Sequence, residues 1–235
     1  MNSSELRGYL TGLIFGDGYI DHGITNRAFR IRSINKDFIE KIYNDLSSCT
    51  NFKMSIIFHK GGFANGCNHK DHWELYIKAH PYFAKKYHHF YDDFGKRVVT
   101  KDSLSWLNDK GLANWYCSDG YICLVGKNKG EIKDRRLEIC TDRYSKETVG
   151  KMSAMLKSKF NLSTSLIKRQ NSYRIRIKKE SYETFFNLVY SYMPESLKYR
   201  LWFGYDFQPK WMSDEMWKLQ ENLRSAIALT SNAEG

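Results

Sequence analysis

The sequence lacks any long apolar stretch. No run of apolar residues reaches the roughly 18 that a membrane-spanning helix requires. Residues 1–5 have neither the basic flank nor the apolar region of a secretory signal. We therefore expect a soluble intracellular protein, cytoplasmic or organellar and not secreted.

Cysteine is scarce and scattered, in an odd number that fits reduced thiols better than a disulfide framework. The five cysteines are Cys49, Cys67, Cys117, Cys123 and Cys140. Cys67 opens the segment 67–72, which also contains two histidines and an aspartate. Because this segment lacks the paired ligand spacing of a structural zinc site, we predict no zinc there.

Acidic residues are outnumbered, with 26 Asp and Glu against 37 Lys and Arg and a net charge of +11. Residues 1–110 have 16 basic and 12 acidic side chains, and residues 111–235 have 21 and 14, so the excess is not confined to a tail. A polyanionic partner would explain this charge. A solvated basic surface that keeps the protein soluble is the alternative.

A repeated segment is the most informative feature of the chain. Residues 10–20 return 102 positions later as residues 112–122, and each copy is an apolar run that ends in Asp-Gly-Tyr-Ile. The acids are Asp17 and Asp119. A carboxylate at the C-terminal end of a helix costs roughly 0.3–1 kcal/mol unless a positive charge offsets it, and a bound cation would do so. Alternatively, Asp-Gly only ends each helix and opens a turn.

The order of predicted elements is the same after each copy. Apolar periodicity predicts strands at 28–34, 53–59 and 73–78 and helices at 36–48 and 80–90 in the first half. In the second half it predicts strands at 121–125, 136–141, 163–169 and 172–178 and helices at 145–159 and 180–192. We therefore predict an α+β fold of two αββαββα repeats, at 1–95 and 111–205. Residues 91–110 connect the two repeats, and the linker proper is 96–110. The tail 206–235 contains a helix at 212–226.

Basic side chains alternate with apolar ones on several predicted strands. Arg174, Arg176 and Lys178 share one face of their strand, and the apolar residues between them share the other. Arg30 and Arg32 alternate similarly with Phe29 and Ile31. Such faces fit the major groove of DNA, although a solvated sheet face also favours polar residues. The predicted DNA-binding residues are Arg30, Arg32, Lys36, Lys168, Arg174, Arg176, Lys178 and Lys198.

With these motifs in place, the chain resembles the single-chain LAGLIDADG homing endonucleases, most like their yeast mitochondrial intron-encoded members. The resemblance runs from Leu10 to about Leu201. Residues 10–18 fit the nine-residue motif, with Phe15 in place of its first acid. In residues 112–120, Asn114 replaces the first glycine and Ser118 the small residue before the acid. The resemblance implies two pseudo-symmetric repeats, with paired motif helices and antiparallel DNA-binding sheets that form a saddle.

The resemblance also implies roles for individual residues. Asp17 and Asp119 would be catalytic acids that bind Mg²⁺ or another divalent metal such as Mn²⁺, with Gly16 and Ser118 as further metal ligands. Lys96, 23 residues before Asp119, would orient water or stabilise charge. Its counterpart would be Arg200, or else Lys198. Asn35 and Asp142 would hold the nucleophilic water. Lys96 and Arg200 could equally be plain phosphate contacts.

Small residues explain how the motif helices could pair. Gly12, Gly16, Ala113 and Ser118 would allow two backbones to approach closely. That pairing would bring Asp17 and Asp119 together, where two like charges need a cation, and Mg²⁺ suits oxygen ligands.

These inferences favour a monomeric, Mg²⁺-dependent, site-specific endonuclease for double-stranded DNA. The resemblance implies a double-strand break across the minor groove that leaves short 3′ overhangs. An intron maturase that acts on RNA, or a DNA- or RNA-binding regulator without cleavage, is the alternative. A basic scaffold without enzymatic function is a third. We see no flanking splicing segments, so we do not expect an intein.

Overall fold

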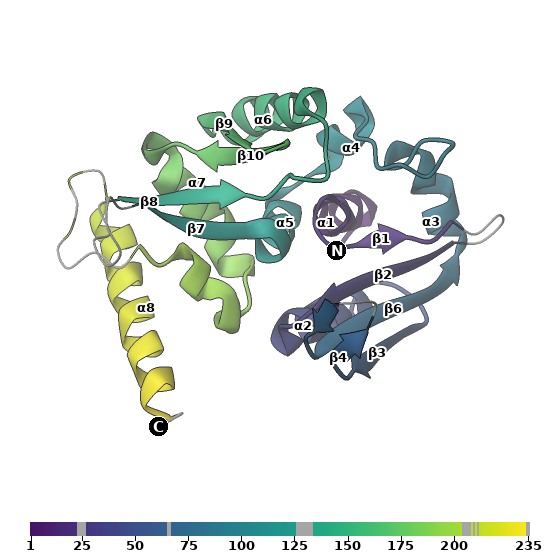
Figure 1. Cartoon of the computed structure of the whole chain (residues 1–235), viewed down its shortest axis with the longest axis horizontal. Helices are drawn as coiled ribbons and strands as arrows, with labels where there is room; N and C mark the ends of the chain where they lie inside the picture. The colour runs from purple at the N-terminus through teal and green to yellow at the C-terminus, as the bar shows by residue number, and fades with distance from the viewer. Residues whose placement is uncertain are drawn as a thin grey trace. The chain divides into compact units, whose positions relative to one another are not determined.

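A computed structural model describes residues 1–22, 27–64, 67–125, 134–203, 208, 210 and 212–233 (Figure 1). The chain divides into two compact units. Unit 1 contains Met1–Ser118 and Tyr192–Ser196, and unit 2 contains Asp119–Ser191 and Leu197–Gly235. Within the described residues, no helix is both long and apolar enough to span a membrane.

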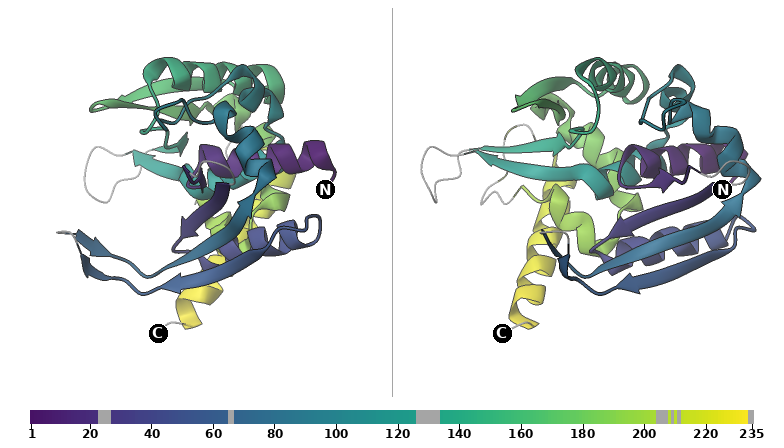
Figure 2. Two further views of the ribbon diagram at one scale, coloured as in Figure 1. Left: turned by 90° about the vertical axis from the view of Figure 1, so that its right-hand side faces the viewer. Right: turned by 45° about the vertical axis from the view of Figure 1, so that its right-hand side comes forward.

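Unit 1 is built on a four-stranded antiparallel sheet with the order β1-β2-β6-β3. Its elements are α1 (Ser3–Phe15), β1 (Tyr19–Ile20), β2 (Arg27–Ser33), α2 (Lys36–Ser47), β3 (Met54–His59), β4 (Gly62–Ala64), β5 (Cys67–His69), β6 (His72–His80), α3 (Pro81–Lys86), η1 (Tyr87–His89), α4 (Lys101–Trp106) and α5 (Asp109–Asp119, whose last residue belongs to unit 2). Strands β3 and β6 continue into the small β4–β5 hairpin (Figure 2), which the sequence analysis did not predict.

One face of this sheet is apolar and packs on α2 and α3. Phe29 and Ile31 on β2 and Leu75 and Ile77 on β6 are fully buried. Ile42 lies on the buried side of α2, which Asn35 caps at its N-terminus. The predicted alternation on β2 is therefore confirmed, because Arg30 and Arg32 lie on the opposite face.

Unit 2 repeats this plan in a sheet of order β7-β8-β10-β9. Its elements are β7 (Gly120–Val125), β8 (Asp134–Ile139), α6 (Lys146–Phe160), β9 (Thr164–Arg169), β10 (Ser172–Ile177), η2 (Lys179–Ser181), α7 (Tyr182–Val189), η3 (Tyr190–Tyr192), η4 (Glu195–Leu201) and α8 (Asp214–Ala233). Helix α6 packs on β9 and β10, and the Tyr182 hydroxyl of α7 accepts the backbone N–H of Leu137 at 3.3 Å. Gln220 of α8 accepts from Phe203 N at 2.8 Å and donates to Leu201 O at 3.0 Å.

Three predicted segments differ from the structure. The helix expected at 80–90 ends at Lys86 and continues as the 3₁₀ turn η1, and the helix expected at 180–192 is α7 between two 3₁₀ turns. The expected linker contains helix α4. Thr100 begins this helix with a capping box, in which its hydroxyl accepts from Ser103 N at 3.1 Å.

Helices α1 and α5 approach each other backbone to backbone. A Cβ atom added to Gly12 would lie 1.8 Å from the carbonyl oxygen of Gly111, and one added to Gly111 would lie 2.1 Å from that of Gly8. One added to Gly16 would lie 2.5 Å from Cβ of Ser118. The sequence analysis identified Gly12, Gly16 and Ser118 but missed Gly8 and Gly111, which lie outside the repeated motif.

This packing predicts opposite effects for two glycine substitutions in helices. Gly12→Ala should lower the free energy of unfolding by more than about 2 kcal/mol, because the methyl group must push the helices apart. Gly150→Ala in α6 should raise it by about 0.5–1 kcal/mol, since nothing lies within 4 Å of the added Cβ and alanine restricts the unfolded chain. Urea denaturation followed by circular dichroism measures both, and equal effects would contradict the close packing.

Candidate active site and nucleic-acid interface

Asp17 lies in the turn between α1 and β1. The turn is tight, because the backbone N–H of Gly18 donates to Leu13 O at 2.8 Å. A Cβ atom on Gly18 would lie 2.7 Å from that same oxygen, so a larger residue does not fit. The predicted acid is therefore held at a defined point directly after the motif helix, where its side chain is half-buried.

Arg97 binds the end of the first motif helix. Its guanidinium donates to the carbonyl oxygens of Ile14, of Gly16 at 3.1 Å and of Gly18 at 2.6 Å. The last carbonyls of a helix have no partner within the helix and carry partial negative charge, so a guanidinium there is favourable. A guanidinium of the protein itself thus offsets the negative end of the helix that precedes Asp17. Arg97 was not predicted from the sequence, although its neighbour Lys96 was.

Asp119 is the last residue of α5, and its side chain is 9% exposed. Its backbone oxygen accepts from Cys140 N at 2.9 Å, which ties it to the end of β8. Arg143 Nη2 lies 3.7 Å from Asp119 Oδ1. Arg200 Nη1 donates to the carbonyl of Gly120 at 3.1 Å. Two arginines of unit 2 thus lie at or beside this acid, and only Arg200 was predicted.

The polar residues expected to hold water have structural partners. Asn35 Oδ1 accepts from Phe38 N at 2.8 Å as the cap of α2, and Nδ2 donates to Ser196 Oγ at 3.1 Å. Asp142 accepts from Arg174, with Nε 2.9 Å from Oδ1. That bond is the main reason that the pKa of Asp142 lies below its ordinary value.

The strand pairings show which positions of the two units are equivalent near Asn35 and Asp142. The tyrosines that follow the two acids pair with Arg30 in unit 1 and with Glu138 in unit 2, so these two positions are equivalent. Counting five residues onward from each, Asn35 corresponds to Arg143. By this count the residue at the position of Asn35 is the arginine beside Asp119, and the roles of Asn35 and Asp142 stay predictions.

The predicted lysines near the two sites differ in their surroundings. Lys96 is exposed, and its backbone N–H donates to Asp92 Oδ1 at 2.8 Å. Lys198 Nζ lies 4.2 Å from the ring centre of Tyr190. Arg200 donates to the carbonyl of the residue after its acid, as Arg97 does in unit 1.

The polar face of the unit 1 sheet is organised around a buried acid. Glu74 on β6 is only 1% exposed and accepts from Arg30 Nη1 at 3.1 Å and from Arg32 Nε at 2.5 Å. Arg30 also reaches Asp21 at 3.2 Å and lies 4.6 Å from the ring centre of Tyr76. The two predicted DNA-binding arginines are therefore held in place by carboxylates.

In unit 2 the buried carboxylate that binds arginines is Glu138 on β8. This fully buried carboxylate accepts from Arg176 Nη2 at 2.6 Å, from Arg169 Nη2 at 3.3 Å and from the Tyr121 hydroxyl at 2.5 Å. Burial alone would raise the pKa of Glu138, but these hydrogen bonds outweigh it and leave the pKa below the ordinary value. Burial, followed by the hydrogen bond to Glu138, raises the pKa of Tyr121 to about 12.

At two equivalent positions of the sheets, one unit has an arginine where the other has a glutamate. Arg30 corresponds to Glu138, as the register above shows, and Glu74 corresponds to Arg174, because each lies directly before the buried residue of its central strand, Leu75 or Ile175. Both sheets thus hold arginines on internal carboxylates but present different side chains. The alternation of acids with buried residues could have revealed Glu74 and Glu138 in the sequence.

The remaining predicted DNA-binding lysines occupy varied places. Lys168 pairs with Tyr173, so it lies on the side of the sheet opposite Arg174; its predicted place on the arginine face was wrong, and Arg169 lies there. Lys36 pairs with Glu40 at 2.9 Å. Lys178 is exposed directly after β10, and its backbone N–H donates to Ser163 O at 2.9 Å.

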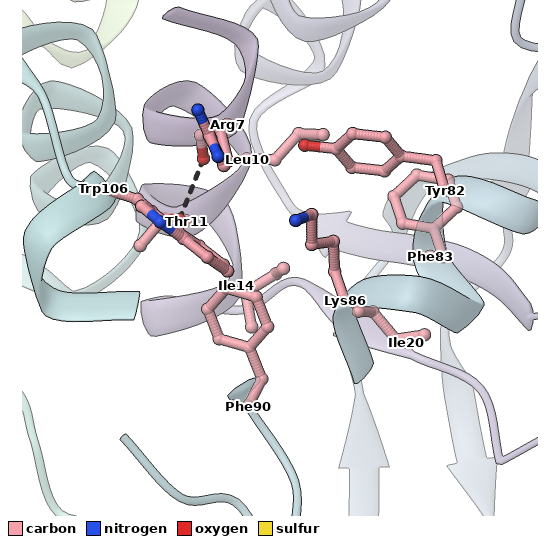
Figure 3. A pocket seen from close by; sticks show the side chains of 10 residues that line it. All are labelled: Arg7, Leu10, Thr11, Ile14, Ile20, Tyr82, Phe83, Lys86, Phe90 and Trp106. Atoms are coloured by element: carbon pink, nitrogen blue, oxygen red, sulfur yellow. Dashed lines mark hydrogen bonds between the residues drawn. The ribbon is translucent and has the colours of Figure 1, made fainter. Parts of the chain in front are cut away.

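A small pocket beside α1 in unit 1 lies apart from these residues (Figure 3). It is lined by Arg7, Leu10, Thr11, Ile14, Ile20, Tyr82, Phe83, Lys86, Phe90 and Trp106. Most of its wall is apolar, and burial raises the pKa of Tyr82 to about 12. Because it contains none of the predicted site residues, we assign it no part in phosphodiester chemistry.

Comparison with known proteins places these features in a family. The family model described as the LAGLIDADG DNA endonuclease family matches residues 7–185, which include both acids and both sheets. The chain belongs to this family.

Individual LAGLIDADG relatives agree with that assignment. The chain is 29% identical to a probable intron-encoded endonuclease 1 of Wickerhamomyces canadensis, over 83% of each chain. It is 21% identical to the DNA endonuclease I-ChuI of Chlamydomonas applanata, over 85% of this chain and 95% of that one. The solved structure of the homing endonuclease I-WcaI bound to its DNA recognition sequence has a TM-score of 0.72 and 27% identity, over 86% and 88% of the two chains.

Membership of the LAGLIDADG family confirms three predictions: the family itself, the mixed fold of helices and antiparallel sheets, and DNA endonuclease as the class of activity. It does not favour the intron maturase alternative. Among the described residues, no group of three or more His, Cys, Asp or Glu side chains could hold a metal ion. A metal bound by a LAGLIDADG acid here would therefore take other ligands from backbone, water or phosphate oxygens.

The buried carboxylate of unit 2 predicts a pH-dependent stability. Glu138→Gln should lower the free energy of unfolding by about 3 kcal/mol at pH 7, because arginines remain without their buried partner. Since the pKa of Glu138 is lowered from 4.5 in the folded state, its contribution is complete above that pH and is lost as the pH falls through the lowered pKa. The difference from wild type should therefore shrink at lower pH.

Urea denaturation at a series of pH values from neutral into the acid range tests this expectation. Glu147→Gln on the exposed surface of α6 is the matched control, because its carboxylate pairs with Lys151 in solvent. A stability difference for Glu138→Gln that persists unchanged in acid would show that the charge of this carboxylate is not what stabilises the sheet.

Proposed function

We propose that this protein is a monomeric, metal-dependent homing endonuclease that cuts both strands of a long double-stranded DNA target at a specific site. The observation that carries the proposal is the matched end of the two motif helices. Asp17 lies in the turn directly after α1, and Asp119 is the last residue of α5. Each aspartate is followed by a glycine whose carbonyl accepts from an arginine. Such repeated support for an acid is not needed by a protein that only binds DNA.

The donor groups at these helix ends fit a hard divalent cation. Asp17 and Asp119 would supply carboxylate oxygens, and Gly16 and Ser118 would supply backbone oxygens, with Mg²⁺ as the preferred ion and Mn²⁺ as a substitute. When bound, such an ion supplies Lewis-acid activation of the phosphate and lowers the pKa of an attacking water.

The other predicted residues would act on the water, the phosphate and the leaving group. Asn35 and Asp142 would orient water from the strand ends, and the register adds Arg143 as a charge beside Asp119. Lys96 in unit 1 and, in unit 2, Arg200 or else Lys198 would stabilise negative charge on the cleaved phosphate. We propose that the products carry short 3′ overhangs.

The sheets would supply recognition of the target. Arg30, Arg32, Arg174 and Arg176 are already oriented by carboxylates, and oriented guanidiniums suit bidentate contacts with guanine edges. Because acid and base are exchanged between equivalent positions of the two sheets, we expect the two halves of the target to differ in sequence. Lys36, Lys178 and Lys198 would contact phosphates.

Substitution of either acid tests the cleavage assignment. We expect Asp17→Asn and Asp119→Asn each to abolish double-strand cleavage while DNA affinity is retained, because the amide keeps the shape but loses the charge that binds metal. The substrate is a plasmid library with random inserts, from which the wild-type target is recovered as linear DNA.

Asp109→Asn, an exposed aspartate at the other end of α5, is the control and should cut as wild type does. Linear product from both Asp17→Asn and Asp119→Asn would show that the acids have been misassigned. A wild-type protein that linearises no member of the library with Mg²⁺ or Mn²⁺ would contradict the endonuclease proposal.

Salt dependence tests the phosphate contacts. Each lysine that neutralises a phosphate releases a counterion, so Lys178→Gln should reduce the slope of log affinity against log salt by about one. Lys151→Gln on α6, whose ammonium lies 2.6 Å from Glu147, should leave the slope unchanged. Fluorescence anisotropy with a short duplex of arbitrary sequence measures both slopes, and identical slopes for the two variants would remove Lys178 from the interface.

A further inference from the structure

The arginine at the end of the first motif helix is itself rigidly placed. Arg97 forms a β-bridge with Tyr91, and the next residue, Val98, donates its N–H to Phe90 O at 2.9 Å. The intervening turn closes through Asp92 N to Lys96 O at 3.0 Å. Gly95 makes this turn possible, because its φ of +74° is one that other residues rarely adopt.

The same segment holds the acid turn on both sides. Tyr91 lies with its ring centre 6.0 Å from the Arg97 guanidinium, and its hydroxyl accepts the N–H of Ile20 at 3.1 Å. Arg97 binds the carbonyls of Gly16 and Gly18, the residues immediately before and after Asp17. The backbone that carries the acid is therefore fixed at three successive points by one short segment some 80 residues away in sequence.

Unit 2 contains the equivalent contact. Arg200, in the 3₁₀ segment η4, donates to the carbonyl of Gly120, the residue immediately after Asp119. Gly18 and Gly120 occupy the same position of the repeated motif. Two segments of different secondary structure thus bring a guanidinium to the equivalent backbone oxygen of each motif.

We propose that Arg97 and Arg200 are a matched pair of positioning residues, each of which orients the backbone oxygens and the carboxylate of its acid turn toward metal. This inference rests on the proposed function, because it assumes that Asp17 and Asp119 bind metal. It assigns Arg200 a role different from that predicted for it.

Two physical effects support this role. A guanidinium at a helix C-terminus offsets the partial negative charge that would otherwise oppose a carboxylate there. Hydrogen bonds to the groups that surround a metal ligand fix its direction, and loss of such a bond typically weakens metal binding 10- to 100-fold. Because Gly16 O is both a partner of Arg97 and a predicted ligand, its orientation depends directly on this arginine.

The test compares metal affinity, cleavage rate and DNA affinity in arginine variants. In Arg97→Met and Arg200→Met we expect the single-turnover cleavage rate to fall about 100-fold, since a small misplacement of reacting groups has effects of this size. Binding of Mn²⁺ to the protein–DNA complex, measured from the electron paramagnetic resonance signal of free Mn²⁺, should weaken about 10-fold. DNA affinity without metal should change less than about twofold.

Matched variants separate positioning from general structural support. Arg27→Met removes another arginine of unit 1 that donates to a backbone carbonyl, that of Asp21 at 3.1 Å, and should change neither Mn²⁺ affinity nor cleavage. Arg97→Lys keeps the charge and one donor, so it should lie between wild type and Arg97→Met. Methylguanidinium added to Arg97→Ala should restore part of the cleavage rate, and it should restore none in Asp17→Asn.

The outcomes distinguish this inference from the proposed function. If Asp17→Asn cuts as wild type does, the assignment of the acids fails. If Asp17→Asn is inactive but Arg97→Met binds Mn²⁺ and cuts as wild type does, the positioning role fails. It also fails if Arg97→Met and Arg97→Lys lose cleavage only in proportion to a loss of folded protein by circular dichroism, with no rescue by methylguanidinium.

Discussion

The backbone contact between α1 and α5 is the constraint on which the rest of the site depends. At Gly12 and Gly111 no side chain separates the two helices, and even one methyl group would overlap a carbonyl oxygen. Close-packed interfaces have few alternative arrangements, so this contact fixes where α1 ends. Only because that end is fixed can a guanidinium from a distant segment bind three of its carbonyls. A helix pair separated by long, flexible side chains would leave the Asp17 turn without a defined partner.

On the two sheets, buried carboxylates fix the orientation of arginines. An arginine that attracts DNA most strongly is unpaired and mobile, whereas one that reads a base must be oriented before it binds. Glu74 and Glu138 hold the arginines around them in one geometry and cancel part of their charge. In the proposed function, sequence-independent attraction to DNA would then depend more on the net charge of +11 and on exposed lysines such as Lys178. The strand pattern would thus separate arginines that are held by carboxylates from lysines that are exposed to solvent.

Local patterns in the sequence predict much of this arrangement, but contacts between distant segments are beyond them. The repeated Asp-Gly-Tyr-Ile locates both acids, and a period of two locates Phe29 and Ile31 correctly. Arg97 has no such signal, because its three partners lie about 80 residues away and no spacing connects them. Lys168 was misplaced for another reason: the hairpin register pairs it with Tyr173, and register depends on the turn between the strands. The helix predicted at 80–90 ends early because periodicity cannot separate α-helical from 3₁₀ turns.

The two acids share one backbone contact and differ in their surroundings. Arg97 and Arg200 bind the same motif carbonyl in each unit, and Arg97 also binds the carbonyls of Ile14 and Gly16. The residue matched to Asn35 by register is Arg143, whose guanidinium lies 3.7 Å from Asp119, whereas Asn35 caps α2 and binds Ser196. A full positive charge beside one acid competes with a metal for the same carboxylate, and a neutral amide does not. This local charge is therefore one physical reason to expect the two DNA strands to be cut at different rates.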